Sequence, residues 1–279
     1  MQSRADFILK ALLSHSDKTK ALERFLPLNI QKELEGLPTL EEEIDIEPFY
    51  HDHSLFEKVH WSWFLPTLKL YPESEQKLFL SALNPQAEKN LAKALTLSVG
   101  QSEITEIGKS FVQKILLDNL IGSEDRLLPT RYLPASPMNR LLHLTKVELI
   151  YLIDRLAMYD LSLELRQIVE TKILKKIYSL ITADEKKTLQ TLSGHKEPFS
   201  LGKLGLDRWD GSEEALRTLL HKRGLVRLGA GLSGQDPDLI WYICHQLDIG
   251  RGSQLHKQCM NEPIHGVTDV IMKQIEEQL

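Results

Sequence analysis

Apolar residues recur at helical spacing along most of this chain, and this periodicity limits the folds that it can adopt. In the segment 141–156, leucine, isoleucine and valine follow one another at steps of three and four residues. On a helix of 3.6 residues per turn, such steps form one broad apolar face. The alternation of apolar and polar residues that is typical of strands is nearly absent. Because α/β folds and barrels need strands between their helices, we predict an all-α fold.

Helix start signals agree with this prediction. Thr145 and Thr182 each precede a glutamate by three residues, as in a capping box, and Asp210 stands in the same relation to Glu213. Proline at a first helical position, as at Pro85 and Pro237, costs no hydrogen bond. The expected helices span residues 4–25, 28–36, 54–70, 73–83, 86–98, 102–121, 145–158, 161–181, 183–193, 212–223, 237–247, 251–260 and 267–278.

Two segments interrupt the helical pattern. Residues 122–136 hold two prolines and a glycine and show no apolar stripe, as expected of a connection between domains. A chain of 279 residues is long enough for about two domains. We therefore predict two helical subdomains of short stacked helices, 1–121 and 137–279, joined by a proline-containing linker at 122–136. The second break, 194–211, is rich in glycine but also in leucine, which predicts a packed loop.

Charge and hydropathy exclude several classes of protein. The chain has 34 Lys and Arg residues against 39 Asp and Glu residues, so its net charge is −5 and its pI is about 6.1. Proteins that bind duplex nucleic acid usually concentrate positive charge, so we expect no nucleic-acid partner. No run of about 18 apolar residues predicts a membrane span, and residues 1–13 lack the pattern of a secretory signal. We expect a cytoplasmic protein.

One glycine motif resembles a phosphate-binding loop. Gly229, Gly231 and Gly234 match G-x-G-x-x-G, in which glycines let a dinucleotide pyrophosphate approach a helix amino end. The motif normally follows a strand, however, whereas here a predicted helix precedes the short apolar run 225–228. We therefore expect a flexible or bulged loop and predict no cofactor and no small-molecule ligand.

Histidines cluster after Pro48, and imidazoles near a carboxylate can bind zinc. The set is His51, Asp52, His53 and His60. Its spacing matches no standard site, so we interpret these residues as exposed histidines of a connector, with His60 near a helix face.

A second set of possible metal ligands is Cys244, His245, His256 and Cys259. Cys244 and His245 are adjacent and point about 100° apart on a helix, which makes joint coordination awkward. We expect buried cysteines that act as small hydrophobic residues and predict no metal. Since no nucleophile elbow or metalloprotease motif occurs either, we predict no catalytic residue, although a site assembled from distant residues stays possible.

Parts of the chain resemble a known family. The segments 216–229 (LRTLLHKRGLVRLG), 232–252 (LSGQDPDLIWYICHQLDIGRG) and 61–83 resemble chlamydial-type, all-helical cytoplasmic proteins of type III secretion. The most similar classes are the K subunit of the sorting platform and the flagellar motor-switch scaffold FliG. The resemblance implies a non-enzymatic adaptor that docks beneath an inner-membrane ring component and contacts other soluble platform proteins.

Two groups of residues are candidates for such contacts. Trp61 and Trp63 lie in a dense aromatic segment, and tryptophan is favoured at interface hot spots. Asp248, Gly250 and Arg251 belong to a segment that we also expect to end one helix and cap the next. Core packing is the alternative role for the two tryptophans, and a structural role at the helix cap is the alternative for the other three residues.

A nucleic-acid-binding regulator is the alternative function. Its basis is a winged-helix-like region at 212–232, in which a helix would end at Gly224 and residues 225–232 would form the wing. The region carries a basic stretch of Arg217, His221, Lys222, Arg223 and Arg227. Cations near a helix carboxyl end are also expected from the helix dipole, and we prefer that explanation.

Overall fold

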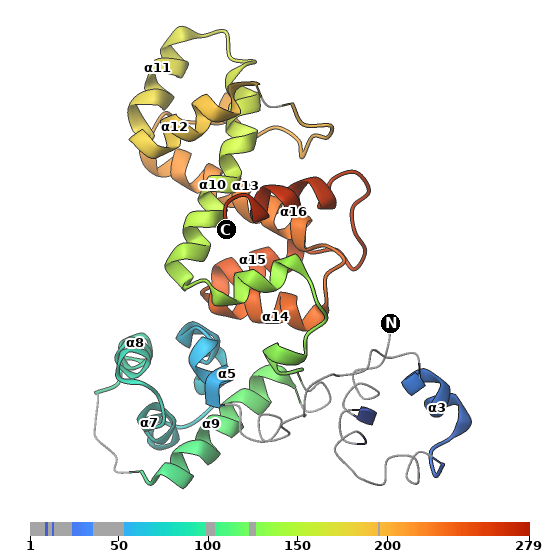
Figure 1. Ribbon diagram of the computed structural model, residues 1–279. Helices are drawn as coiled ribbons and strands as arrows, with labels where there is room; N and C mark the ends of the chain where they lie inside the picture. The colour runs from blue at the N-terminus through green and yellow to red at the C-terminus, as the bar shows by residue number, and fades with distance from the viewer. Residues whose placement is uncertain are drawn as a thin grey trace.

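The computed structural model describes residues 9–10, 13, 24–35, 53–98, 104–122, 127–194 and 196–279. These residues form helices and turns, with no strand among them, so the predicted all-α fold is confirmed (Figure 1). The helix expected at 4–25 and the site residues His51 and Asp52 lie mostly or wholly outside the described residues. Every described helix is too short or too polar to pass through a lipid bilayer.

The α-helices are α3 (Leu28–Glu35), α5 (His53–Lys58), α6 (Leu65–Leu68), α7 (Glu73–Ser81), α8 (Pro85–Leu95), α9 (Glu106–Ile121), α10 (Lys146–Leu165), α11 (Thr171–Leu180), α12 (Ala183–Thr191), α13 (Glu213–Leu232), α14 (Pro237–Gln246), α15 (Ile249–Gln258) and α16 (Thr268–Glu276). Short 3-10 turns are η1 (Trp61–Trp63), η2 (Thr130–Tyr132), η3 (Pro137–His143), η4 (Leu192–Gly194) and η5 (Leu206–Arg208).

Most predicted helix starts are confirmed. Thr145 and Thr182 each form a complete capping box with the glutamate three residues on. Pro85 and Pro237 each occupy the first turn of their helix. The prediction for Asp210 is wrong by two residues, because Ser212 caps α13 and Asp210 instead accepts a hydrogen bond from the Ser212 backbone N–H.

Two helix boundaries also differ from the prediction. The single helix expected at 54–70 is broken into α5, η1 and α6, because His60 is extended and its N–H donates to the backbone of α14 instead of to its own helix. In contrast, the break expected near residue 160 is absent. Helix α10 runs on to Leu165, and the chain turns only before α11.

The largest correction concerns α13, which passes through Gly224, Gly229 and Gly231 without a break. The predicted loop at the G-x-G-x-x-G motif is therefore wrong, and the wing at 225–232 that the alternative function requires is not formed. The glycines serve close packing: a Cβ on Gly224 would lie 1.9 Å from Ile153 O of α10, and one on Gly229 would lie 2.4 Å from Gln258 Cβ. Only Gly234, at φ 78°, lies beyond the helix in a turn.

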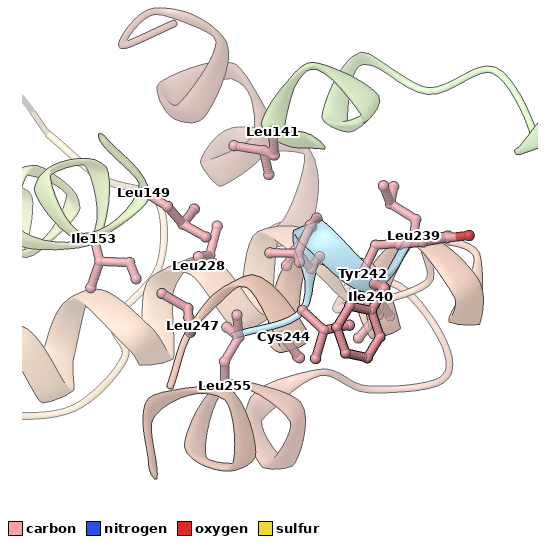
Figure 2. Close-up of a cluster of buried hydrophobic side chains, with 14 of the residues drawn as sticks. Leu141, Leu149, Ile153, Leu228, Leu239, Ile240, Tyr242, Cys244, Leu247 and Leu255 are labelled. Atoms are coloured by element: carbon pink, nitrogen blue, oxygen red, sulfur yellow. The ribbon is translucent and has the colours of Figure 1, made fainter. Parts of the chain in front are cut away.

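Helices α10 and α13 make the most extensive contact between elements and connect two hydrophobic cores. The upper core contains residues 157–165 of α10 with Leu216 and Leu220 of α13, covered by α11 and α12 at the top of Figure 1. The lower core contains the first half of α10, residues 225–232 of α13, α14–α16 and the layer α5–α9. Figure 2 shows the leucines of α10, α13 and the α14–α15 region gathered in the lower core.

The predicted linker packs on this lower core over its described part. Leu128 and Leu133 are buried, and the Leu128 N–H donates to Asp238 Oδ2 at 3.1 Å. The Tyr242 hydroxyl donates to Leu128 O at 2.7 Å. The lower core includes residues from both sides of the linker, while the boundaries 1–121, 122–136 and 137–279 stay a prediction. The predicted packed loop at 194–211 is confirmed by the burial of Leu204 and Leu206.

Candidate interaction surface

The two predicted groups of interface residues meet in the structure. The turn η1 lies against the junction of α14 and α15, and three hydrogen bonds join them. His60 N–H donates to His245 O at 2.8 Å, and the Trp63 indole N–H donates to Leu247 O at 2.9 Å. In return, Ile249 N–H donates to Ser62 Oγ at 2.9 Å. This junction brings Trp61 and Trp63 close to the segment that contains Asp248, Gly250 and Arg251.

Trp63 belongs to an aromatic stack at this junction. The His245 ring lies between Trp63, at a centroid distance of 4.0 Å, and Trp241, at 3.8 Å. Burial lowers the pKa of His245 to about 4, although the hydrogen bond of its Nδ1 with Trp241 O acts in the opposite direction. The ring therefore packs as a neutral aromatic group near pH 7. Trp63 stays partly exposed, but His245 covers one part of its ring.

Gly252 permits the close approach of η1. A Cβ at this position would lie 2.2 Å from Cys244 O and 2.6 Å from Trp63 Cζ2. Trp61 is partly exposed and tilts against His60 at a centroid distance of 5.1 Å. Both tryptophans thus contribute to packing, and their role in binding a partner stays a prediction.

Asp248 caps α15, as predicted, by accepting a hydrogen bond from Arg251 N–H. Its other carboxylate oxygen pairs with the Arg251 guanidinium at 2.5 Å. Burial acts to raise the pKa of Asp248, but the hydrogen bonds and charge of Arg251, together with Lys146, lower it on balance. Gly250, in contrast, is exposed, and a Cβ there would meet only Asp248 Oδ1 at 3.4 Å.

A chain of polar side chains extends from this cap to α13. Arg251 Nε donates to His221 Nε2 at 2.9 Å, and His221 Nδ1 lies 2.7 Å from Asp154 Oδ1 of α10. Because a guanidinium can only donate, Arg251 is the donor in the first of these contacts. The His221 ring thereby links a guanidinium to a carboxylate.

His60 is the other end of this series of polar side chains. Lys146 Nζ lies 2.8 Å from His60 Nε2 and 3.6 Å from Asp248 Oδ2. Burial and then the Lys146 charge lower the pKa of His60 to about 4. His60 was interpreted from the sequence as an exposed histidine of a connector, but it is partly buried, and both of its ring nitrogens have protein partners: Lys146 at Nε2 and Ser62 Oγ at Nδ1, 2.8 Å away.

A groove of about 840 Å³ opens beside this polar chain, between α10, α12, α13 and α15. Three of the five predicted interface residues, Asp248, Gly250 and Arg251, line it. The other lining residues are Ile150, Asp154, Met158, Glu185, Glu213, Glu214, Arg217, Thr218, Leu220, His221, Lys222 and Gln254. Its base is apolar and its edges are charged, which is the composition of a surface that binds peptide segments.

The basic stretch of α13 mostly faces the protein itself. Arg223 donates to the backbone carbonyls of Leu201 and Lys203. Arg227 is 0% exposed and pairs with Asp160 and Glu197. Burial raises the pKa of Asp160, and the two arginines oppose this shift. The nucleic-acid alternative therefore lacks the wing that it requires, and Arg223 and Arg227 bond to the protein itself instead of facing a nucleic acid.

The candidate metal ligands do not converge in the part of the chain that the structure describes. No group of three or more His, Cys, Asp or Glu side chains there could hold a metal ion. Cys244 is buried as predicted, and Cys259 is partly buried. Burial raises the pKa of both thiols, that of Cys259 to about 12. Because the thiolate is the form that reacts and binds metals, both sulfurs are poor nucleophiles at neutral pH.

Exposed apolar side chains gather in pairs on two helices. On α9, Ile107 and Phe111 are one turn apart and are 84% and 64% exposed. On α10, Val147 and Tyr151 are likewise one turn apart and exposed, but the Tyr151 hydroxyl donates to Asp184 Oδ2. The prediction from sequence missed all four residues. Their periodicity alone did not distinguish a core face from a solvent face.

Comparisons with protein-family models, with curated proteins and with solved structures found no match to this chain.

Proposed function

We propose that the chain is a non-enzymatic adaptor that binds protein partners through its helices, within a bacterial type III secretion apparatus. The observation that carries the adaptor role is the exposed pair Ile107 and Phe111 on α9. Two large apolar side chains one turn apart form a continuous apolar strip, and such strips on soluble proteins typically mark contact sites.

The composition of α9 supports this role. Val112 and Leu116 bury one face of the helix against the lower core. Ile107 and Phe111 lie on another face of the same helix. A helix that is apolar on two faces has more apolar surface than its own core can cover, so the second face is available to a partner.

The secretion-apparatus part of the proposal depends on the sequence resemblance of segments 61–83, 216–229 and 232–252. In the structure these segments are part of α13, α14, the start of α15 and the region from η1 to α7, and of these η1, α13, α14 and α15 are joined by the hydrogen bonds described above. The expected partners are other platform proteins and an inner-membrane ring component. A cytoplasmic location is part of the same proposal.

The proposal is tested by affinity capture of the tagged full-length chain from the organism that makes it, followed by mass spectrometry. We expect the unmodified chain to capture secretion-platform proteins. The double variant Ile107→Ser/Phe111→Ser is expected to capture about tenfold less of them. Val169→Ser is the matched control, because Val169 is 93% exposed but lies between α10 and α11 instead of on α9. Capture of no secretion component by the folded chain would overturn the secretion role. Equal capture by the double variant would overturn the role of α9.

A further inference from the structure

We infer that the groove between α10, α12, α13 and α15 binds a basic, amphipathic helical segment of a protein partner. The inference rests on the proposed adaptor function and names the partner chemistry for a second surface, separate from α9. Three observations carry it: the dimensions of the groove, its apolar base and its excess of carboxylates.

The groove has the size and base that an apolar helix face requires. Its volume is about 840 Å³, and Ile150, Met158 and Leu220 lie at its base. Val147 is three residues before Ile150 on α10 and is 76% exposed. Because residues three apart share a helix face, Val147 extends the apolar base towards solvent. A helix lying in a groove typically buries apolar side chains at such positions.

The charges of the groove favour a basic partner. Five carboxylates and three cationic side chains line it, which leaves a net charge of −2. Arg217 already pairs with Glu185 and Arg251 with Asp248, so these cations are not available to an acidic ligand.

Two carboxylates account for the excess. Asp154 contacts the His221 ring, and none of the ion pairs found among the described residues joins it to a lysine or arginine. Glu214 is exposed, and none of the ion pairs found among the described residues includes it. Lysine or arginine side chains of a partner would complement both groups, whereas a phosphorylated or acidic segment would be repelled. Lys222 is exposed at the groove edge and is the one lining cation without an ion pair in the described part of the chain.

The test is a fluorescence anisotropy titration of the full-length protein with a labelled synthetic peptide of about 18 leucines and lysines in amphipathic helical order. We expect saturable binding at about 0.1 M salt and an affinity about tenfold weaker for Glu214→Lys. Glu75→Lys is the matched control, because Glu75 is also an exposed residue in the first turn of a helix, and the change of net charge is the same. This control is expected to bind within about twofold of the unmodified protein.

The apolar base is tested in the same titration. Val147→Ser is expected to weaken binding about threefold to tenfold, and Val169→Ser to leave it unchanged. If Glu214→Lys and Glu75→Lys weakened peptide binding equally, the affinity would depend only on the net charge of the protein, and the inference would be overturned. Absence of binding by the folded protein, or preference for a matched leucine and glutamate peptide, would overturn it as well. Each of these failures leaves capture through Ile107 and Phe111 intact, so it is distinguishable from failure of the adaptor function.

Discussion

His245 shows how one buried ring makes the stability of the protein depend on pH. Its ordinary pKa is 6.5, and burial between Trp63 and Trp241 lowers this to about 4 in the folded protein. Between pH 6.5 and about 4, His245 binds a proton in the unfolded chain but not in the folded protein. The contribution of the neutral His245 ring to the free energy of unfolding is therefore complete above pH 6.5, and it is lost as the pH falls from 6.5 towards 4.

The prediction is tested with His245→Phe, which keeps an aromatic ring between the tryptophans but cannot be protonated. Urea unfolding is measured at pH 7 and at pH 4.5 for both proteins. Between pH 7 and pH 4.5, we expect the free energy of unfolding to fall by about 2 kcal/mol more in the unmodified protein than in the variant. His60, whose pKa is also lowered to about 4, contributes equally to both proteins. An identical loss in the two proteins would show that His245 is not protonated differently on unfolding.

Local signals at single residues were predictable from the sequence, and long-range contacts were not. The capping boxes at Thr145 and Thr182 and the cap at Asp248 depend on neighbours within three or four residues, so the sequence predicts them correctly. The stacking of His245 depends on Trp63, which is far away along the chain. No local pattern indicates that contact.

At the scale of helices, the crossing of α10 and α13 determines the frame of the molecule, and Gly224 permits it. A Cβ at residue 224 would lie 1.9 Å from the backbone oxygen of Ile153. Because this neighbour is backbone and cannot rotate away, Gly224→Ala must push the two helices apart. We expect the free energy of unfolding to fall by about 3 kcal/mol, at the upper end of overpacking costs.

Gly250→Ala is the control for this crossing. Gly250 is also within a helix, but a Cβ there meets only Asp248 Oδ1 at 3.4 Å. Alanine favours helix by about 1 kcal/mol over glycine, so this variant is expected to be unchanged or slightly more stable. Urea midpoints and slopes of both variants make the comparison. A Gly224→Ala protein as stable as the unmodified protein would contradict the close crossing.

The same helix shows why element boundaries were predicted less well than fold class. Glycine is common just after a helix end, and a prediction from local pattern therefore ended the helix at Gly224. In the structure, Gly224, Gly229 and Gly231 lie inside α13 and let α10, α15 and α16 approach it. Packing between distant helices thus overrode the local preference of glycine. The groove was missed for the same reason, since it exists only where four helices meet.

At the scale of the whole molecule, the two cores share their central helices. The first half of α10 and the second half of α13 belong to the lower core, and the other halves belong to the upper core. If either core unfolded alone, half of α10 and half of α13 would lose the contacts that pack them. Since most helical stability in proteins comes from such packing, neither half would persist alone, and we expect the two cores to unfold together.

The tryptophans allow this to be measured, because Trp209 packs on the upper core while Trp61, Trp63 and Trp241 pack on the lower core. Incorporation of 5-fluorotryptophan gives one ¹⁹F resonance for each, assigned with single Trp→Phe variants. We expect the urea midpoints of the Trp209 and Trp241 resonances to agree within about 0.3 M. An earlier transition at Trp209 would mean that the upper core opens separately. The shared helices α10 and α13 would then act as a hinge between two units instead of a common frame.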